Sequence, residues 1–196
     1  MNKLIAIAIV LVGLIFAASA SAQTAWFETQ VSASKVEGQY KLSPIVAGNA
    51  SKRLGSGFGA FTFALATDGF AQLYGGPTYA PTKHLELGLG GGLSNNGEFR
   101  KGGYAWFGGS SGYLLALGEH DHLSGWWYRS IAAAKPTDTL AVGGHVQRYI
   151  GVGPYVELKL ETGVLPITIW AAPIAYDWEA SQGSQAKSLA GLRAHF

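Results

Sequence analysis

The densest group of potentially reactive side chains is the run Glu119-His120-Asp121-His122. Imidazole nitrogens and carboxylate oxygens bind Zn²⁺ and Cu²⁺, so His120 and His122 with one of the acids are candidate metal ligands. Residues at alternate positions share a face only in an extended strand, and no third His lies near in the sequence. A solvated loop at 119–125 explains the same residues without a ligand, and we expect neither a metal nor another cofactor.

The same stretch also offers a hydrolytic pair, because a His two residues before a Ser can activate its hydroxyl for attack on an ester. His122 and Ser124 are similar in spacing to the His-x-Ser arrangement of outer-membrane lipid A deacylases. The Asn that usually follows that Ser is Gly125 here, and no Glu lies a dozen residues on to orient the His. The extended motif of outer-membrane phospholipases is also absent, since no His precedes Asn96-Gly97 closely. A lipid A or phospholipid hydrolase is therefore the third functional hypothesis.

Apolar and polar residues alternate along most of the chain, whereas no stretch of useful length has helical periodicity. Between 85 and 94, the leucines fall on one face and Glu86 with three glycines on the other, and Asn95-Asn96-Gly97 then signals a hairpin. Ser32 to Lys35 is predicted as a turn, and 44–57 as a connection or a poorly ordered end. The predicted strands are 25–32, 36–43, 58–66, 70–80, 85–94, 100–108, 113–118, 126–134, 140–147, 155–161, 167–178 and 187–196.

The composition is unusual for a water-soluble domain. The chain contains 28 Gly, six Trp, nine Tyr and nine Phe, and 13% of its residues are charged against ~25% in typical globular domains. A net charge of +2 without a basic cluster excludes a nucleic-acid partner. The absence of Cys excludes disulfides, thiolate metal sites and a lipoprotein anchor.

The last ten residues, 187–196, form an alternating strand in which Leu192, Ala194 and Phe196 share one face. This ending resembles the outer-membrane β-barrel proteins of Gram-negative bacteria, whose terminal strand with its final Phe is read by the barrel assembly machinery. The resemblance implies an all-β, antiparallel up-and-down transmembrane barrel with Phe196 as the assembly signal. It also implies outer-membrane lipids and the assembly machinery as partners, and it leaves protein partners and a homo-oligomer open. A soluble sandwich would carry more Lys, Glu and Thr on its outward strand faces.

Residues 1–22 have the pattern of a cleaved secretory signal peptide, with Lys3 before an apolar run and either Ala18-Ser19-Ala20 or Ala20-Ser21-Ala22 as a small-residue cleavage site. The apolar run, 4–18, is shorter than the ~20 residues of a membrane-spanning helix. We therefore expect export to the outer membrane and a single barrel domain at 23–196.

The number of strands depends on the first hairpin. Twelve result if 25–43 joins the wall, ten if the wall begins at 58, and eight if several short runs fuse; all three are even, as in bacterial single-chain barrels. We predict twelve, because the first hairpin alternates as regularly as the later ones. Arg193 in the terminal strand then needs an acidic partner, and Glu28 is the candidate.

If the apolar face of each strand contacts lipid, the other face surrounds an interior in which charges must pair. Twelve strands favour an aqueous path, in which Gly88 and Gly90 would leave local space, whereas a salt-bridged plug is the alternative. The residues predicted to line this lumen are Glu28, Glu37, Lys41, Glu86, Gly88, Gly90, Arg129, His145, Glu157, Lys159, Asp177, Arg193 and His195.

Aromatic residues next to predicted outer loops are expected at the bilayer interface, namely Trp126, Trp127, Tyr128, Tyr176 and Trp178. The outer loops are all short, which argues against a large recognition surface. The first functional hypothesis is a small passive pore for ions or small solutes, not an enzyme. The second is a non-conducting structural barrel or a scaffold that holds partner subunits in the outer membrane.

Overall fold

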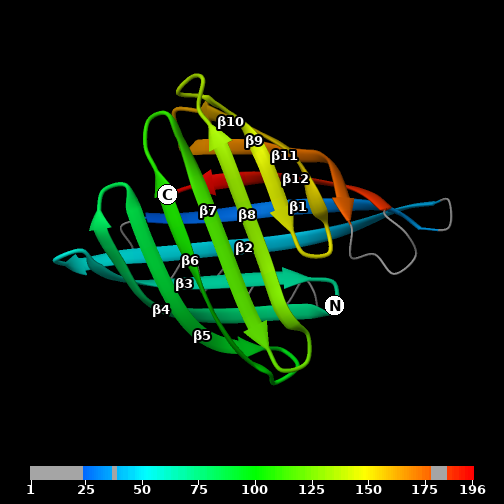
Figure 1. The fold of residues 1–196 in the computed structure, drawn as a ribbon, viewed down its shortest axis with the longest axis horizontal. Coiled ribbons are helices and arrows are strands. Elements are labelled where there is room, and N and C mark those ends of the chain that lie inside the picture. The colour runs from blue at the N-terminus through cyan, green and yellow to red at the C-terminus, as the bar shows by residue number, and fades with distance from the viewer. Residues whose placement is uncertain (1–23, 37–38, 178–184) are drawn as a thin grey trace.

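The computed structural model describes residues 24–36, 39–177 and 185–196, which form a closed all-β barrel (Figure 1). The strands, in chain order, are β1 (Thr24–Val36), β2 (Gln39–Gly55), β3 (Phe58–Thr67), β4 (Phe70–Thr82), β5 (Leu85–Ser94), β6 (Phe99–Gly108), β7 (Gly112–Asp121), β8 (Gly125–Ala134), β9 (Leu140–Gln147), β10 (Gly151–Glu161), β11 (Pro166–Asp177) and β12 (Gln185–His195). The predicted signal peptide at 1–22 lies outside the described residues.

Each strand pairs antiparallel with the next, and β12 pairs with β1 to close the barrel. At this seam, Glu28 is the register partner of Arg193, and Ala25 and Phe196 exchange two backbone hydrogen bonds of 3.2 and 2.8 Å. The predicted twelve-stranded, up-and-down barrel is therefore confirmed. No helix in the described part of the chain is long and apolar enough to cross a membrane.

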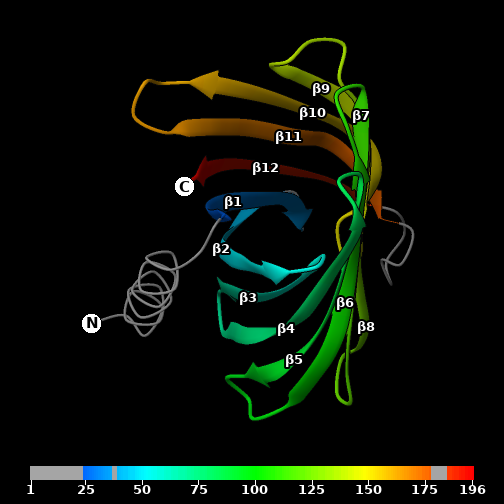
Figure 2. The same cartoon turned by 90° about the vertical axis from the view of Figure 1, so that its left-hand side faces the viewer.

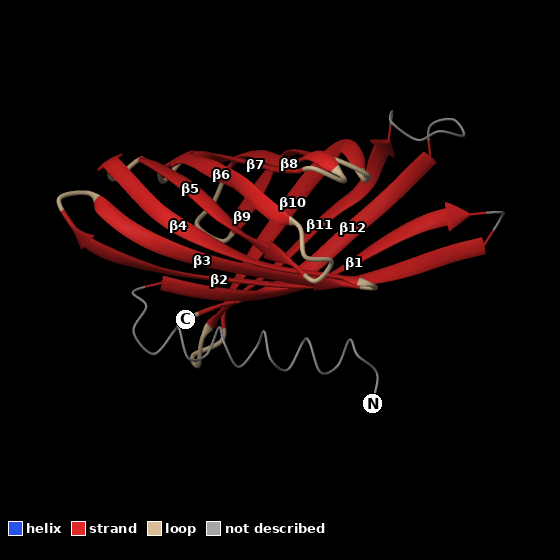
Figure 3. Ribbon diagram, turned by 90° about the horizontal axis from the view of Figure 1, so that it is seen from below, coloured by secondary structure: helices blue, strands red, loops and turns tan. Residues whose placement is uncertain are grey.

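The front and back walls cross at a steep angle in Figure 1, as expected for strands that tilt against the barrel axis. Figure 2 shows β1 and β12 side by side, with the end of β12 next to the start of β1. Figure 3 shows that connections gather at both ends of the barrel. We call the end that holds Thr24 and His195 the terminal end, and the opposite end, with the turn at 122–124, the distal end.

Two predictions about the first hairpin were wrong. Ser32 to Lys35 are not a turn but continue β1, and most of 44–57 is not a connection but the second half of β2. Pro44 is tolerated inside a long strand because β3 begins to pair with β2 only at Ile45, so the missing N–H of Pro44 faces no neighbouring strand. The polar and Gly-rich composition of 44–57 therefore concealed a regular ladder.

Candidate functional site in the barrel interior

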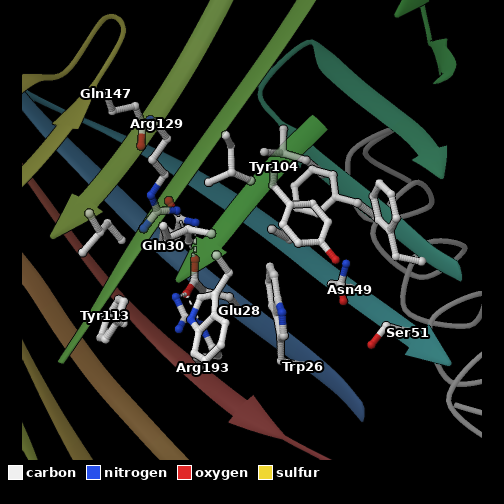
Figure 4. A pocket seen from close by; sticks show the side chains of 18 of the residues that line it. Trp26, Glu28, Gln30, Asn49, Ser51, Tyr104, Tyr113, Arg129, Gln147 and Arg193 are labelled. Atoms are coloured by element: carbon white, nitrogen blue, oxygen red, sulfur yellow. Dashed lines mark hydrogen bonds and ion pairs between the residues drawn. The ribbon is translucent and has the colours of Figure 1, made fainter. Parts of the chain in front are cut away.

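A cavity of about 420 Å³ lies inside the barrel and is lined by residues of β1 to β10 and β12 (Figure 4). The interior beside it, on the β8 to β12 side, is filled by a buried apolar cluster that includes Ile131, Tyr155, Trp170 and Leu189. The cavity therefore lies between this packed region and the opposite wall.

The opposite wall of the cavity is aromatic. Phe61 packs edge to face against Tyr74 and Tyr104, with ring centroids 5.7 and 5.2 Å apart. Phe63 contacts Tyr74 at 5.3 Å and Trp26 at 6.2 Å in the same way. Assigning the apolar face of every strand to lipid was thus wrong for β3, whose Phe61 and Phe63 face the cavity.

The rings lie inside because β5 provides room for them. A Cβ atom added to Gly88 would lie 2.2 Å from the Tyr104 ring, and one added to Gly90 would lie 3.0 Å from both Phe61 and Tyr74. The prediction that these glycines leave open space in the lumen was therefore wrong, because the aromatic rings occupy that space.

A buried group of charges, which we call the central ionic cluster, consists of Glu28, Arg129 and Arg193. The Glu28 carboxylate is fully buried, and its Oε2 accepts hydrogen bonds from Arg193 Nε at 2.6 Å and from Trp170 Nε1 at 2.8 Å. Gln30 Nε2 donates to the other oxygen, Oε1. Arg193 Nη2 lies 2.5 Å from Oε2, which makes the seam pair the tightest contact of the cluster.

Arg129 reaches the same carboxylate from the far side of the barrel. Its Nη1 lies 3.7 Å from Glu28 Oε1, although β8 and β1 are not neighbours in the sheet. Its guanidinium also stacks over the Trp170 ring at 4.8 Å. The contact between Arg129 and Glu28 therefore spans the lumen and constricts it.

Charged and phenolic side chains surround the cavity toward the terminal end. Glu157 accepts hydrogen bonds from the hydroxyls of Tyr113 at 2.9 Å and Tyr155 at 2.7 Å. Lys135 Nζ lies 5.6 Å from the centre of the Tyr113 ring. Glu86 of β5 accepts a hydrogen bond of 2.6 Å from the Tyr104 hydroxyl.

A second buried group lies toward the distal end, on the inner face of β4, β6 and β7. Arg100 forms ion pairs with Asp121 and, at 3.4 Å, with Glu119, which also accepts a 3.0 Å hydrogen bond from Gln72 Nε2. Sequence reasoning did not place this group, because Glu119 and Asp121 were predicted in a loop and instead end β7. The signal was present, since the two acids alternate with His120 as residues of a strand do.

The other predicted lumen residues divide between the interior and the ends. His145 is buried on β9, and His195 is half-buried with its Nε2 3.1 Å from Thr168 Oγ1. Lys41 and Lys159 are exposed at opposite ends of the barrel. Glu37 lies outside the described residues, as does the side chain of Asp177.

Not all of the predicted interface aromatics lie on the outer face. Trp126 and Tyr176 are 63% and 55% exposed, and Tyr128 lies on the same face of β8 as Trp126. Trp127 lines the cavity, so its assignment to the interface was wrong: consecutive strand residues alternate between faces. Trp178 lies outside the described residues.

The strand geometry does not bring together the residues predicted to bind a metal, and it does not join His122 to Ser124 as a hydrolase would require. His120 packs against Trp126 at 5.1 Å, on the face of β7 opposite to Asp121, and His122 lies in the turn. The described residues contain no group of three His, Cys, Asp or Glu side chains that could hold a metal ion. The Ser124 hydroxyl donates a hydrogen bond to Asp121 rather than to His122.

The fold defines the class of closed antiparallel β-barrels, and solved porin structures share this fold. The chain is similar to the KdgM porin at 9% identity, with a TM-score of 0.53 over 87% of this chain and 99% of that one. It is also similar to the KdgM porin in complex with disordered oligogalacturonate, at 10% identity and a TM-score of 0.54 over the same shares. A triple mutant of the Rhodopseudomonas blastica porin matches at 13% identity and a TM-score of 0.37, over 89% of this chain and 99% of that one. No protein-family model and no curated protein matches the chain.

Proposed function

We propose that this protein is a passive outer-membrane channel for ions and small polar solutes. The observation that carries the proposal is the 420 Å³ cavity inside a closed twelve-stranded barrel, with charged residues along it. A barrel of this size encloses more space than its own side chains need to fill. The fold shared with the KdgM porin, one structure of which is a complex with oligogalacturonate, supports the proposal.

The outer face of the barrel supports a membrane location. Leu87, Leu89 and Leu93 alternate along β5 on its outer side and are 41%, 71% and 60% exposed, as a lipid-facing band requires. In this proposal residues 1–22 direct export, Phe196 is the assembly signal, and the terminal end faces the periplasm. Lipids and the barrel assembly machinery are then the partners of the chain.

A second candidate function is a non-conducting barrel that acts as a structural element or a scaffold for partner subunits. The cross-lumen contact between Arg129 and Glu28 favours it, because a stable bridge of buried charges can hold a narrow lumen closed. The two functions differ in one measurable property, which is ionic current.

Single-channel recording in planar bilayers tests the proposal. Protein whose folding is verified by heat-modifiable gel migration should give discrete current steps, and heat-unfolded protein should give none. Lys135→Glu, which reverses a charge on the cavity wall, should change the step size, whereas Lys52→Glu on the exposed terminal end of β2 should not. A flat baseline from folded protein would contradict the channel and favour the scaffold.

A further inference from the structure

The two arginines of the central ionic cluster use their donors differently. Arg193 directs both Nε and Nη2, the two donors of one guanidinium edge, at Glu28 Oε2. The same edge of Arg129 is buried, and its Nε and Nη2 have no hydrogen-bond partner in the structure. Only Nη1 of Arg129 approaches Glu28, at 3.7 Å. A guanidinium edge matches the two oxygens of a carboxylate or a similar oxyanion, so Arg129 holds an unused recognition surface.

The charges that line the cavity balance, with Glu28, Glu86 and Glu157 against Arg129, Lys135 and Arg193. Within the central ionic cluster the two arginines share Glu28, and Glu157 also attracts Arg193. Arg193 therefore has two acids near it, whereas Arg129 approaches Glu28 at 3.7 Å. The less neutralised positive charge of the cluster is thus that of Arg129, at the bridge across the lumen.

The surroundings of Arg129 show that its positive charge is available to a solute in the cavity. Glu28 is held at the seam by Arg193, so its negative charge is already neutralised by a closer partner than Arg129. Across the ladder, Arg129 faces Gln147, and His145 lies two residues before Gln147 on the same face of β9. Neither provides a negative charge. Arg129 also lines the cavity, so a rotation of its side chain brings the free edge to a solute there.

We infer that Arg129 determines the selectivity of the lumen: its charge favours anions, and its free Nε and Nη2 edge binds the oxyanion group of a small solute. The selectivity part of this inference rests on the proposed channel function. The binding part applies to the folded barrel whether or not it conducts.

Reversal potentials measured in a KCl gradient test whether the charge of Arg129 sets the ion selectivity. Wild-type protein should pass chloride in preference to potassium, Arg129→Gln should bring the permeability ratio close to one, and Arg129→Glu should favour potassium. Arg129→Lys keeps the charge and should keep the preference for chloride, and Lys52→Gln, a change of exposed charge on the outer face of β2, should behave as wild type. An identical reversal potential for wild type and folded Arg129→Gln would overturn the selectivity role.

Acetate binding to the folded protein in detergent tests the free edge without requiring current. Trp170 lies under the Arg129 guanidinium, so a saturable change in tryptophan fluorescence on addition of acetate should occur in the wild type and in Lys52→Gln. It should be absent in Arg129→Gln and in Arg129→Lys, whose ammonium lacks the planar edge. A wild type without a saturable change, or an unchanged response in Arg129→Lys, would overturn the oxyanion site. A flat bilayer baseline would contradict the channel alone, and the acetate titration would then decide the site.

Discussion

Glu28 and Arg193 are direct register partners across the seam of β1 and β12, with Arg193 Nη2 2.5 Å from Glu28 Oε2. The first and last strands of the barrel are thus joined by a buried ion pair as well as by their backbone ladder. Because the pair exists only if β1 belongs to the wall, it ties the number of strands to the chemistry of the lumen.

The seam itself can be tested by cross-linking, since the chain contains no Cys that would interfere. Thr29 and Leu192 are register partners, and both are exposed on the outer face. The double variant Thr29→Cys with Leu192→Cys should form a disulfide on mild oxidation, because register partners lie within the reach of such a bond. Thr29→Cys with Ser130→Cys, on β8, is the control that should stay reduced. Failure of the seam pair to cross-link in folded protein would argue for a wall without β1.

Removing the charge of Glu28 should destabilise the barrel. In Glu28→Gln, two buried guanidinium groups lose their common anion, and breaking a buried ion pair in this way costs about 3–5 kcal/mol. The midpoint of unfolding in urea, followed by gel migration, should therefore fall clearly. Glu161→Gln is the matched change at the exposed pair with Lys159, 2.6 Å long, and should alter stability by only ~0–1 kcal/mol. Equal effects of the two changes would contradict the central role of Glu28.

The packing of glycine against aromatic rings predicts that the cost of a Gly→Ala change in stability depends strongly on its position. Gly88→Ala places a methyl group 2.2 Å from the Tyr104 ring, and overpacking of this kind costs about 1–3 kcal/mol. Gly144→Ala should be nearly neutral, because the nearest atom to its Cβ lies 4.0 Å away. If overpacking is the cause, Tyr104→Ala in the Gly88→Ala background should recover part of the loss, as a double-mutant cycle measured by urea unfolding would show.

The turn between β7 and β8 depends on Asp121. Its Oδ1 accepts hydrogen bonds from the backbone N–H groups of Leu123 at 2.8 Å and Ser124 at 2.6 Å. Asp121→Ala removes both bonds together with the buried ion pair to Arg100, so limited proteolysis at 122–124 should become faster. Ser124→Ala keeps the two backbone bonds and should remain resistant; rapid cleavage of both variants would assign the protection to the hydroxyl instead.

The hydrolase hypothesis predicts activity that depends on Ser124. Because the Ser124 hydroxyl donates a hydrogen bond to Asp121, whose carboxylate also pairs with Arg100, and not to His122, no imidazole base is placed to activate it, and we expect no release of fatty acid from phospholipid or lipid A vesicles above the protein-free rate. Ser124→Ala and the wild type should give the same result in this assay. Release that is lost in folded Ser124→Ala would restore the enzyme hypothesis.

Much of the wall was predictable from local pattern. The strands at 85–94 and 140–147 have the predicted bounds, because alternation and strong turn residues act over a few positions. The errors at 44–57 and 119–121 arose where polar or Gly-rich residues continue a ladder that neighbouring strands hold together. A one-residue bulge between Ala172 and Ala175 could not be predicted either, since only the pairing of β11 with β10 and β12 makes it visible.

The sequence by itself determined the fold class of this protein: alternating segments, compact turns and an aromatic terminal strand specify an up-and-down barrel, with twelve strands favoured over ten or eight. The tertiary structure alone decided which face of β3 is inside, because alternation defines two faces but not the side on which space is available for rings. It also decided that Arg129 meets Glu28, since that contact crosses the lumen between strands that never pair. The physical reason is range: hydrogen-bond ladders propagate from neighbour to neighbour, whereas the lumen forms only when the last strand closes on the first.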